Sequence, residues 1–258
     1  MHDINKDKLT IKIFTATEAM AHEAANDVSA RIHEVLKEKE FINIIFAAAP
    51  SQTGFLYALA ACDIEWERVN AFHMDEYIKL PKEAPQGFGN FLRRCLFDLV
   101  PLHQVFYLNG LGDVDEECMR YSALLSKYPV DIVCLGIGEN GHIAFNDPHV
   151  ADFKDPLSVK VVRLDEICRQ QQVNDHCFDR IEDVPRLALT LTIPTLLSVP
   201  YLHCVVPFRS KAQAVYNTLN GEISENCPAS VLRTKENAIL YLDQESSSLL
   251  DLHRKVSD

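Results

Sequence analysis

Short apolar runs that alternate with amphipathic segments constrain the fold of this chain more than any other feature. FINIIFAAA at 41–49 is apolar along almost its whole length, which is typical of a strand buried on both faces of a sheet. LTIKIF at 9–14 alternates apolar and polar residues like a shorter strand. The segment 15–35 begins with Thr15 and Glu18 in capping-box spacing. It then repeats apolar residues at helical period, at Met20, Ala24, Val28, Ile32 and Val35.

The alternation of strand and helix continues along the chain. Further strands are predicted at 69–74, 104–110, 130–138, 157–164, 201–208 and 238–243. Helical segments are predicted among them at 54–62, 89–99, 114–126 and 209–220. This order favours an α/β class, a Rossmann-like layered fold with a mainly parallel central sheet flanked by helices. In such folds ligand sites collect outside the carboxyl ends of the strands.

Nothing in the sequence divides it into two domains. It contains no Gly/Ser-rich or Pro-rich stretch, no block of like charge, no internal repeat and no low-complexity tract. Hydrophobic residues make up 47% and charged residues 24%, which is ordinary for a globular protein with a large core. We therefore predict that residues 1–258 form a single domain.

Charge and hydropathy narrow the partners that we expect. The net charge is -12 and no cluster of Lys and Arg occurs, which argues against a nucleic-acid surface. No apolar run resembles a signal peptide or approaches the roughly 18–20 residues that span a bilayer. Eight cysteines without a CxxC pair indicate reduced thiols. We expect a cytoplasmic protein with no membrane contact, and an anionic ligand held by a few local cations remains open.

Three polar loops, 48–53, 73–79 and 136–148, follow predicted strands and should meet at one edge of the sheet. In FHMDEYIKLP (72–81) a strand runs directly into Asp75, a carboxylate that can either cap a turn or serve a site. The sequence alone leaves both alternatives open.

CLGIGENGHIAFNDP (134–148) is the richest of these loops. Its glycines permit unusual backbone conformations and close approach of a ligand, at Gly136, Gly138 and Gly141. His142 can exchange protons near neutral pH, and Asp147 or Glu139 could orient it. The alternative is a surface turn with a structural histidine.

Other chemistries fit the sequence poorly. The Gly-x-Gly-x-x-Gly pattern at 136–141 lies mid-chain and runs into AFNDP, so we reject a dinucleotide fingerprint. The sequence has no HExxH helix and no Cys/His quartet at zinc spacing, so we expect no metal. A Gly-x-Ser-x-Gly elbow for a serine nucleophile is also missing.

LGIGENGHIAFNDP and FHMDEY together resemble the glucosamine-6-phosphate deaminase/isomerase family, to which the 6-phosphogluconolactonases are related. The resemblance continues in the family's order through AAPSQTGFL, DVPRLALTLTIPTLL, PFRSKAQAV and CPASVLR. The IAFNDP tail is similar to deaminases rather than to lactonases.

The resemblance implies aldose-to-ketose isomerisation of a hexosamine 6-phosphate with loss of ammonia, without a cofactor. Glucosamine 6-phosphate would give fructose 6-phosphate, and the galactosamine epimer is equally open. His142 would open the sugar ring, and Asp75 would move a proton between C2 and C1. Many family members carry Asp at the position of Asn140 and Glu at the position of Asp147. We expect Asp147 to reach His142 directly or through one water, with Asn140 supporting the loop; otherwise Asp147 caps the turn before Pro148.

The residues that would bind the phosphate group come from separate segments of the chain. Ser51, Gln52 and Thr53 offer hydroxyls and backbone N–H groups at a helix start. Lys211 matches the family's phosphate lysine, and Arg169 is the candidate for its lid arginine, with a solvated helix charge as the alternative. A sugar-phosphate sensor and a 6-phosphogluconolactonase are the competing functions. Because Asp75 and His142 are present, the sequence favours an enzyme, and it is compatible with a homo-oligomer.

Overall fold

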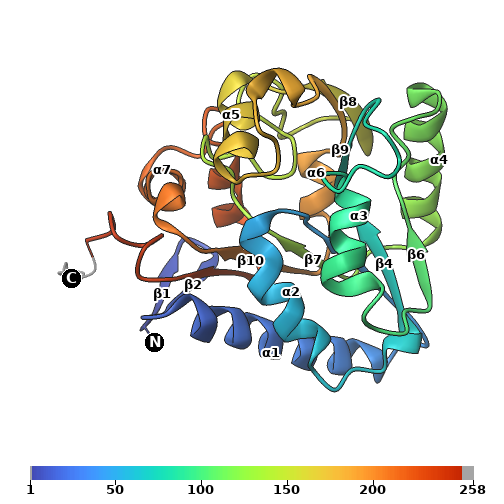
Figure 1. The fold of residues 1–258 in the computed structure, drawn as a ribbon. Coiled ribbons are helices and arrows are strands. Elements are labelled where there is room, and N and C mark those ends of the chain that lie inside the picture. The colour runs from blue at the N-terminus through green and yellow to red at the C-terminus, as the bar shows by residue number, and fades with distance from the viewer. Residues whose placement is uncertain (1, 252–258) are drawn as a thin grey trace.

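A mostly parallel central sheet organises the computed structural model, which describes residues 2–251. Its eight strands lie in the order β1 (His2–Lys6), β2 (Leu9–Ile13), β11 (Ala238–Leu242), β10 (Tyr201–Val206), β7 (Ile132–Leu135), β3 (Ile42–Phe46), β4 (Val69–His73) and β6 (Gln104–Phe106). Every neighbouring pair is parallel except β1 and β2, which are antiparallel. The predicted α/β layered fold is therefore confirmed (Figure 1).

A second, smaller sheet is also present. From the sequence we predicted one central sheet and did not assign any strand to a second one. Its strands are antiparallel and lie in the order β5 (Asp75–Tyr77), β9 (Leu187–Leu191) and β8 (Val159–Arg163). The predicted strand 157–164 thus belongs to this sheet, and β5 and β9 were not predicted. Since β5 continues almost directly from β4, the small sheet stands at the carboxyl edge of the central one.

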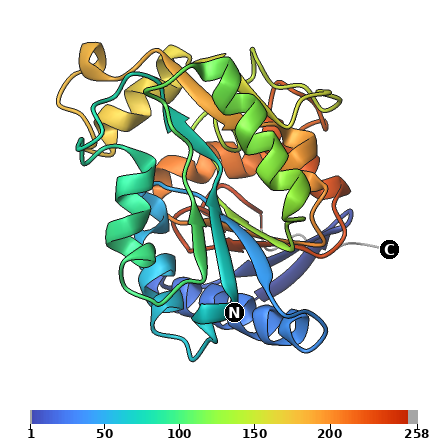
Figure 2. The same cartoon turned by 90° about the vertical axis from the view of Figure 1, so that its right-hand side faces the viewer.

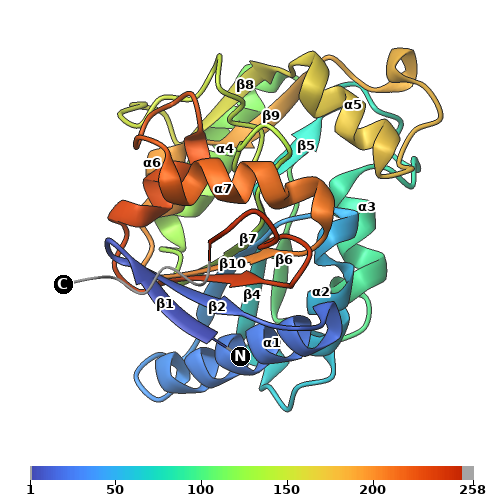
Figure 3. The same cartoon turned by 90° about the vertical axis from the view of Figure 1, so that its left-hand side faces the viewer.

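Helices cover both faces of the central sheet. They are α1 (Thr17–Leu36), α2 (Thr53–Ala60), α3 (Phe88–Leu92), α4 (Val114–Lys127), α5 (Glu166–Asn174), α6 (Ile193–Leu197) and α7 (Ala212–Asn220). Arg93–Phe97 forms a π-helical turn, and short 3₁₀ turns occupy Pro50–Gln52, Trp66–Arg68, Ile181–Asp183, Arg209–Lys211 and Pro228–Thr234. Figure 2 shows α4 on the opposite side of the sheet from α1, and Figure 3 shows the same for α7. Among the described residues, no helix combines the length and apolar character needed to cross a bilayer.

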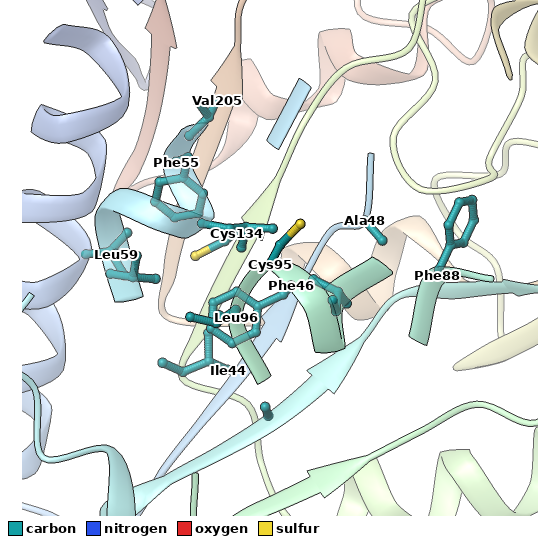
Figure 4. Close-up of a cluster of buried hydrophobic side chains, with 14 of the residues drawn as sticks. Ile44, Phe46, Ala48, Phe55, Leu59, Phe88, Cys95, Leu96, Cys134 and Val205 are labelled. Atoms are coloured by element: carbon teal, nitrogen blue, oxygen red, sulfur yellow. The ribbon is translucent and has the colours of Figure 1, made fainter. Parts of the chain in front are cut away.

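Two hydrophobic clusters lie on the two faces of the sheet. Strand β3 is buried along its whole length and sends Ile44 and Phe46 into one cluster and Ile45 into the other. This alternation is the period of two that a strand imposes on its side chains. Figure 4 shows Ile44 and Phe46 packed near Leu59 of α2. All eight cysteines are free, as expected, and several of them fill these clusters.

Candidate active site

The carboxyl ends of three neighbouring strands and helix α5 enclose a pocket. It is lined by residues from 47–52 after β3, 74–75 after β4 and 136–145 after β7, by Phe88, and by Gln171 and Gln172 of α5. All three predicted loops contribute to it, so they meet at one edge of the sheet as the sequence predicted. A larger cavity of about 520 Å³ lies beside Glu76, Arg93 and Tyr107 and contains none of the predicted site residues.

Asp75 is the first residue of β5 and lies in the wall of this pocket. Its strand partner is Thr190 of β9, which places the carboxylate at the junction of the two sheets. Only 6% of the residue is exposed. Burial raises the pKa of the Asp75 carboxyl well above its ordinary value, and the charge of Glu76 raises it further. A carboxyl group with a raised pKa can hold a proton as well as release it near neutral pH.

His73 fixes the bend that carries Asp75, and the sequence analysis did not identify it. The backbone N–H of Leu108 donates to its Nε2 at 2.9 Å, so Nδ1 carries the proton and donates to the Asp75 carbonyl at 2.9 Å. Burial lowers the pKa of His73 to about 4, which keeps the ring neutral. A histidine inside an apolar strand, two residues before a carboxylate, was the signal that could have revealed it.

His142, Asn140 and Asp147 form a hydrogen-bonded group. His142 Nδ1 lies 3.0 Å from Asp147 Oδ1 and 2.7 Å from Asn140 Oδ1. Both neighbours are acceptors, so Nδ1 carries a proton and Nε2, which bonds no described residue, is free for a ligand. We expected Asp147 to reach His142 directly or through one water, and the contact is direct.

Asp147 is held as a carboxylate although it is completely buried. Burial, the largest single effect, would raise its pKa, but the contributions of His142, Asn140 and the Asp165 backbone together keep the pKa below its ordinary value. The Asn140 amide, which donates to Oδ1 at 3.0 Å, and the Asp165 backbone N–H, which donates to Oδ2 at 3.0 Å, act in the same direction. The carboxylate therefore accepts N–H groups on both oxygens.

The glycines of the loop make room for protein side chains, and Gly136 and Gly138 also line the pocket. A Cβ on Gly138 would come within 2.1 Å of the His142 ring, and one on Gly136 within 2.7 Å of Gln52 Nε2. Gly141 has a φ of +85°, a conformation that residues with a side chain rarely adopt. These residues therefore shape the loop that presents His142.

The predicted phosphate residues fall into three environments. Ser51 and Gln52 line the pocket, and Gln52 Nε2 donates to the Val205 carbonyl at 2.9 Å. Thr53 begins α2 and does not line the pocket. Lys211 lies at the end of a 3₁₀ turn and is only 2% exposed.

The ammonium group of Lys211 has no hydrogen-bond partner among the described residues. Burial lowers its pKa, while the charges of Asp175 and Glu139 act in the opposite direction. A buried charge without a partner is costly, so this position favours an anionic ligand.

Arg169 is not brought into the pocket. Its guanidinium donates to the carbonyls of Val184, at 3.1 Å from Nη2, and of Ile181. The residue is buried and instead lines a neighbouring cavity with Arg163 and Arg186. It is therefore not a solvated helix charge, and in this structure it stabilises the turn at 181–184.

Helix α5 contributes two further residues that the sequence analysis missed. Gln171 and Gln172 are buried and line the pocket. Gln171 Oε1 accepts the backbone N–H of Glu139 at 2.9 Å, which ties α5 to the loop of His142. The three consecutive glutamines of CRQQQ, which serve no apolar stripe, were the available signal.

Two sets of potential metal ligands meet at Asp147. One contains His142 and Cys168, and the other contains His149 and Asp165. Both oxygens of Asp147 already accept N–H groups, and His149 Nε2 contacts the Arg163 carbonyl at 2.9 Å. The hydrogen bonds account for this clustering, and neither set supports a metal proposal.

Known proteins resemble this chain over most of its length. The family described as glucosamine-6-phosphate isomerases/6-phosphogluconolactonase matches residues 15–241. A glucosamine-6-phosphate deaminase of Bacillus cereus (strain B4264) is 38% identical over 231 residues, which cover 87% of this chain and 86% of the relative. The deaminase of Bacillus thuringiensis (strain Al Hakam) matches with the same identity and coverage.

Solved structures give the same result. A monomeric glucosamine-6-phosphate deaminase has a TM-score of 0.84 and 30% identity, and the match covers 93% of this chain and 99% of that chain. The 6-phosphogluconolactonase from Thermotoga maritima, at 18% identity and a TM-score of 0.75, covers 92% of this chain and 99% of its own and shares the fold. On the family match and the 38% identity, this chain belongs to the glucosamine-6-phosphate isomerase/6-phosphogluconolactonase family.

Proposed function

We propose that this protein converts a hexosamine 6-phosphate into the corresponding ketose 6-phosphate and ammonia. The observation that carries the proposal is the placement of Asp75 and the His142–Asp147 pair in the wall of one pocket. Relatives that align over most of the chain are named glucosamine-6-phosphate deaminases, which supports the same reaction. The structures of 6-phosphogluconolactonases are 14–18% identical and support only the shared fold.

The first step in this proposal is ring opening by His142. Its Nδ1 proton is engaged by Asp147 and Asn140, so Nε2 is the nitrogen that can take the proton of the anomeric hydroxyl. The same proton then passes to the ring oxygen as the bond between C1 and the ring oxygen breaks. Asp147 stabilises the transient positive charge on the imidazole.

The second step belongs to Asp75. Its carboxylate takes the proton from C2 and returns it to C1, while O1 gains a proton and the amino nitrogen loses one, which converts the amino aldehyde into a hydroxymethyl imine with the C=N bond at C2. Water adds to C2 and ammonia leaves, giving the ketone. The raised pKa of Asp75 suits a group that must hold a proton between two carbon atoms.

The phosphate group is proposed to bind the ammonium of Lys211 together with Ser51 and Gln52. Support comes from the buried, unpartnered state of Lys211 and from the pocket-lining positions of the other two. Thr53 stands at the start of α2 next to them and stays a candidate. Arg169 could join only if α5 moved, because its guanidinium is occupied by two carbonyls.

Product analysis tests the proposal. Purified protein is incubated separately with glucosamine 6-phosphate, galactosamine 6-phosphate and 6-phosphogluconolactone. We expect ammonia and ketose phosphate in equal amounts from one of the two amino sugars. Binding without ammonia release would favour a sensor, and hydrolysis of the lactone alone would favour a lactonase.

The cytoplasmic location, the single domain and a homo-oligomeric state are proposals that rest on the sequence. They are tested by fluorescence microscopy of a tagged chain, by the cooperativity of unfolding and by sedimentation velocity, respectively.

A further inference from the structure

The amide of Asn140 bridges two carboxylates. Its Nδ2 donates to Asp147 Oδ1 and to Asp165 Oδ2, each at 3.0 Å. Its Oδ1 accepts the backbone N–H of His142 at 3.0 Å. Turning the amide over would place its oxygen against two carboxylate oxygens and its NH₂ against an N–H group. The surrounding atoms therefore fix the orientation of the amide.

Asp165 makes three contacts where a helix cap needs only one. Its Oδ1 accepts the backbone N–H of Cys168 at 2.6 Å and caps α5. Its Oδ2 is the oxygen that accepts from Asn140, and its own backbone N–H donates to Asp147 Oδ2 at 3.0 Å. One residue thus joins the start of α5 to both partners of His142.

We propose that Asp165 is a positioning residue that, paired with Asn140, holds Asp147 and hence the His142 ring in the orientation that ring opening requires. The inference rests on the proposed function and assigns a role to a residue outside the predicted site. The contact is complementary in hydrogen bonding, because the neutral NH₂ group of Asn140 donates one hydrogen to each of the two carboxylates. Because α5 also carries Gln171 into the pocket, the same contact fixes one wall of the site.

Exchanging the two side-chain types tests the pair. Asn140→Asp would put three carboxylates in contact, and Asp165→Asn would put two amide NH₂ groups against each other. The double variant Asn140→Asp/Asp165→Asn restores a donor and an acceptor across this contact and keeps the net charge. We expect each single variant to lower kcat about ten- to a hundredfold, since charge-assisted hydrogen bonds are lost, with KM changed about twofold or less. The double variant should regain at least about tenfold over the worse single variant.

Helix capping is separated from positioning by a matched control. Asp165→Ser keeps a capping hydroxyl but cannot reach Asn140, so kcat should fall while α5 stays capped. Asp113 caps α4 by accepting the backbone N–H groups of Asp115 and Glu116, and it does not line the pocket. Asp113→Ser should leave kcat unchanged. An Asp165→Ser variant with the parent's kcat would overturn the proposal.

Unfolding measurements make the test independent of the substrate. Chemical denaturation of the parent, both single variants and the double variant gives a coupling free energy between positions 140 and 165. We expect the double variant to lose less free energy of unfolding than the sum of the losses in the two single variants. No coupling in either stability or kcat would overturn the pair. If the parent releases no ammonia, the proposed function fails, and the unfolding cycle still decides whether the pair exists.

Discussion

At the scale of single residues, two of the predicted site residues, Asp75 and Lys211, are buried polar groups that water would otherwise stabilise, and Asp75 alone of the two lines the pocket. Asp75 is enclosed beside Glu76, and Lys211 is enclosed without a partner. Each arrangement costs free energy of folding. Groups of this kind are found mainly at functional sites, because there the function requires them. The two residues therefore allow separate tests of proton transfer and of phosphate binding.

Asp75→Asn should abolish turnover while leaving substrate binding nearly intact. The amide keeps the shape of the side chain but cannot take a proton from C2, and general acid–base catalysis contributes ~10²–10⁴-fold. The measurement is the exchange of the C2 hydrogen with D₂O, followed by NMR. Glu76→Gln changes the neighbouring carboxylate, which lines the larger cavity, and should cost much less. Exchange at the parent's rate in Asp75→Asn would remove Asp75 from the mechanism.

Lys211→Met should weaken substrate binding and stabilise the free protein. Loss of the ammonium removes a charged contact to phosphate, worth about ten- to a hundredfold in KM. The same change removes a buried, unpartnered charge, so the free energy of unfolding without ligand should rise. Steady-state kinetics and urea denaturation measure the two effects. An unchanged KM would show that the phosphate binds elsewhere.

At the scale of elements, the sequence predicts strands with long apolar runs and misses elements that are short and polar. Strands β3 and β7 are apolar runs, and the loops that follow them line one pocket, as predicted. Strand β5 consists of Asp-Glu-Tyr, and its pairing with β9 depends on residues more than 100 positions away. The role of Asp165 at the start of α5 was not predicted for a similar reason, because its partners Asn140 and Asp147 lie on another loop.

The 136–148 loop is fitted to the short carboxylate of Asp147. Both oxygens are bonded and the residue is fully buried, so Asp147→Glu adds a methylene to filled space, which typically costs ~1–3 kcal/mol. We expect ammonia release to fall about tenfold or more, together with the melting temperature. Asp131→Glu, a buried carboxylate at the amino end of β7, should lower only the melting temperature. Faster ammonia release by Asp147→Glu would show instead that the short side chain limits the reaction.

At the scale of the whole molecule, buried polar groups connect the layers. His203 of β10 contacts the hydroxyl of Tyr241 of β11 at 2.9 Å through Nδ1. That hydroxyl donates to Asp27 of α1 at 2.8 Å, and Lys12 of β2 pairs with the same carboxylate at 2.6 Å. Because the tyrosine proton is used by Asp27, His203 Nδ1 must be the donor to Tyr241. The chain of contacts keeps a proton on His203 Nδ1 and joins three strands to the helix beneath them.

Stability should therefore depend on the protonation of His203. Burial is the largest cause of its pKa of about 4, against 6.5 for an ordinary histidine; Asp27 raises the pKa, while Arg31 and Lys12 lower it. Between these two values the unfolded chain binds a proton that the folded chain does not, so this residue destabilises the fold as pH falls from about 6.5 to about 4.

His203→Phe keeps a ring of similar size and removes the proton-binding site. The parent's free energy of unfolding, measured by urea denaturation at intervals from pH 7 to pH 4, includes a loss of up to ~1.4 kcal/mol per pH unit from this one residue. In His203→Phe that component should vanish, so the variant's curve should be flatter than the parent's below pH 6.5 whatever their difference at pH 7. Buried carboxylates such as Asp75, whose pKa is raised, shift both curves alike and cancel in the comparison. Parallel curves for parent and variant would show that His203 binds its proton equally in the folded and unfolded states.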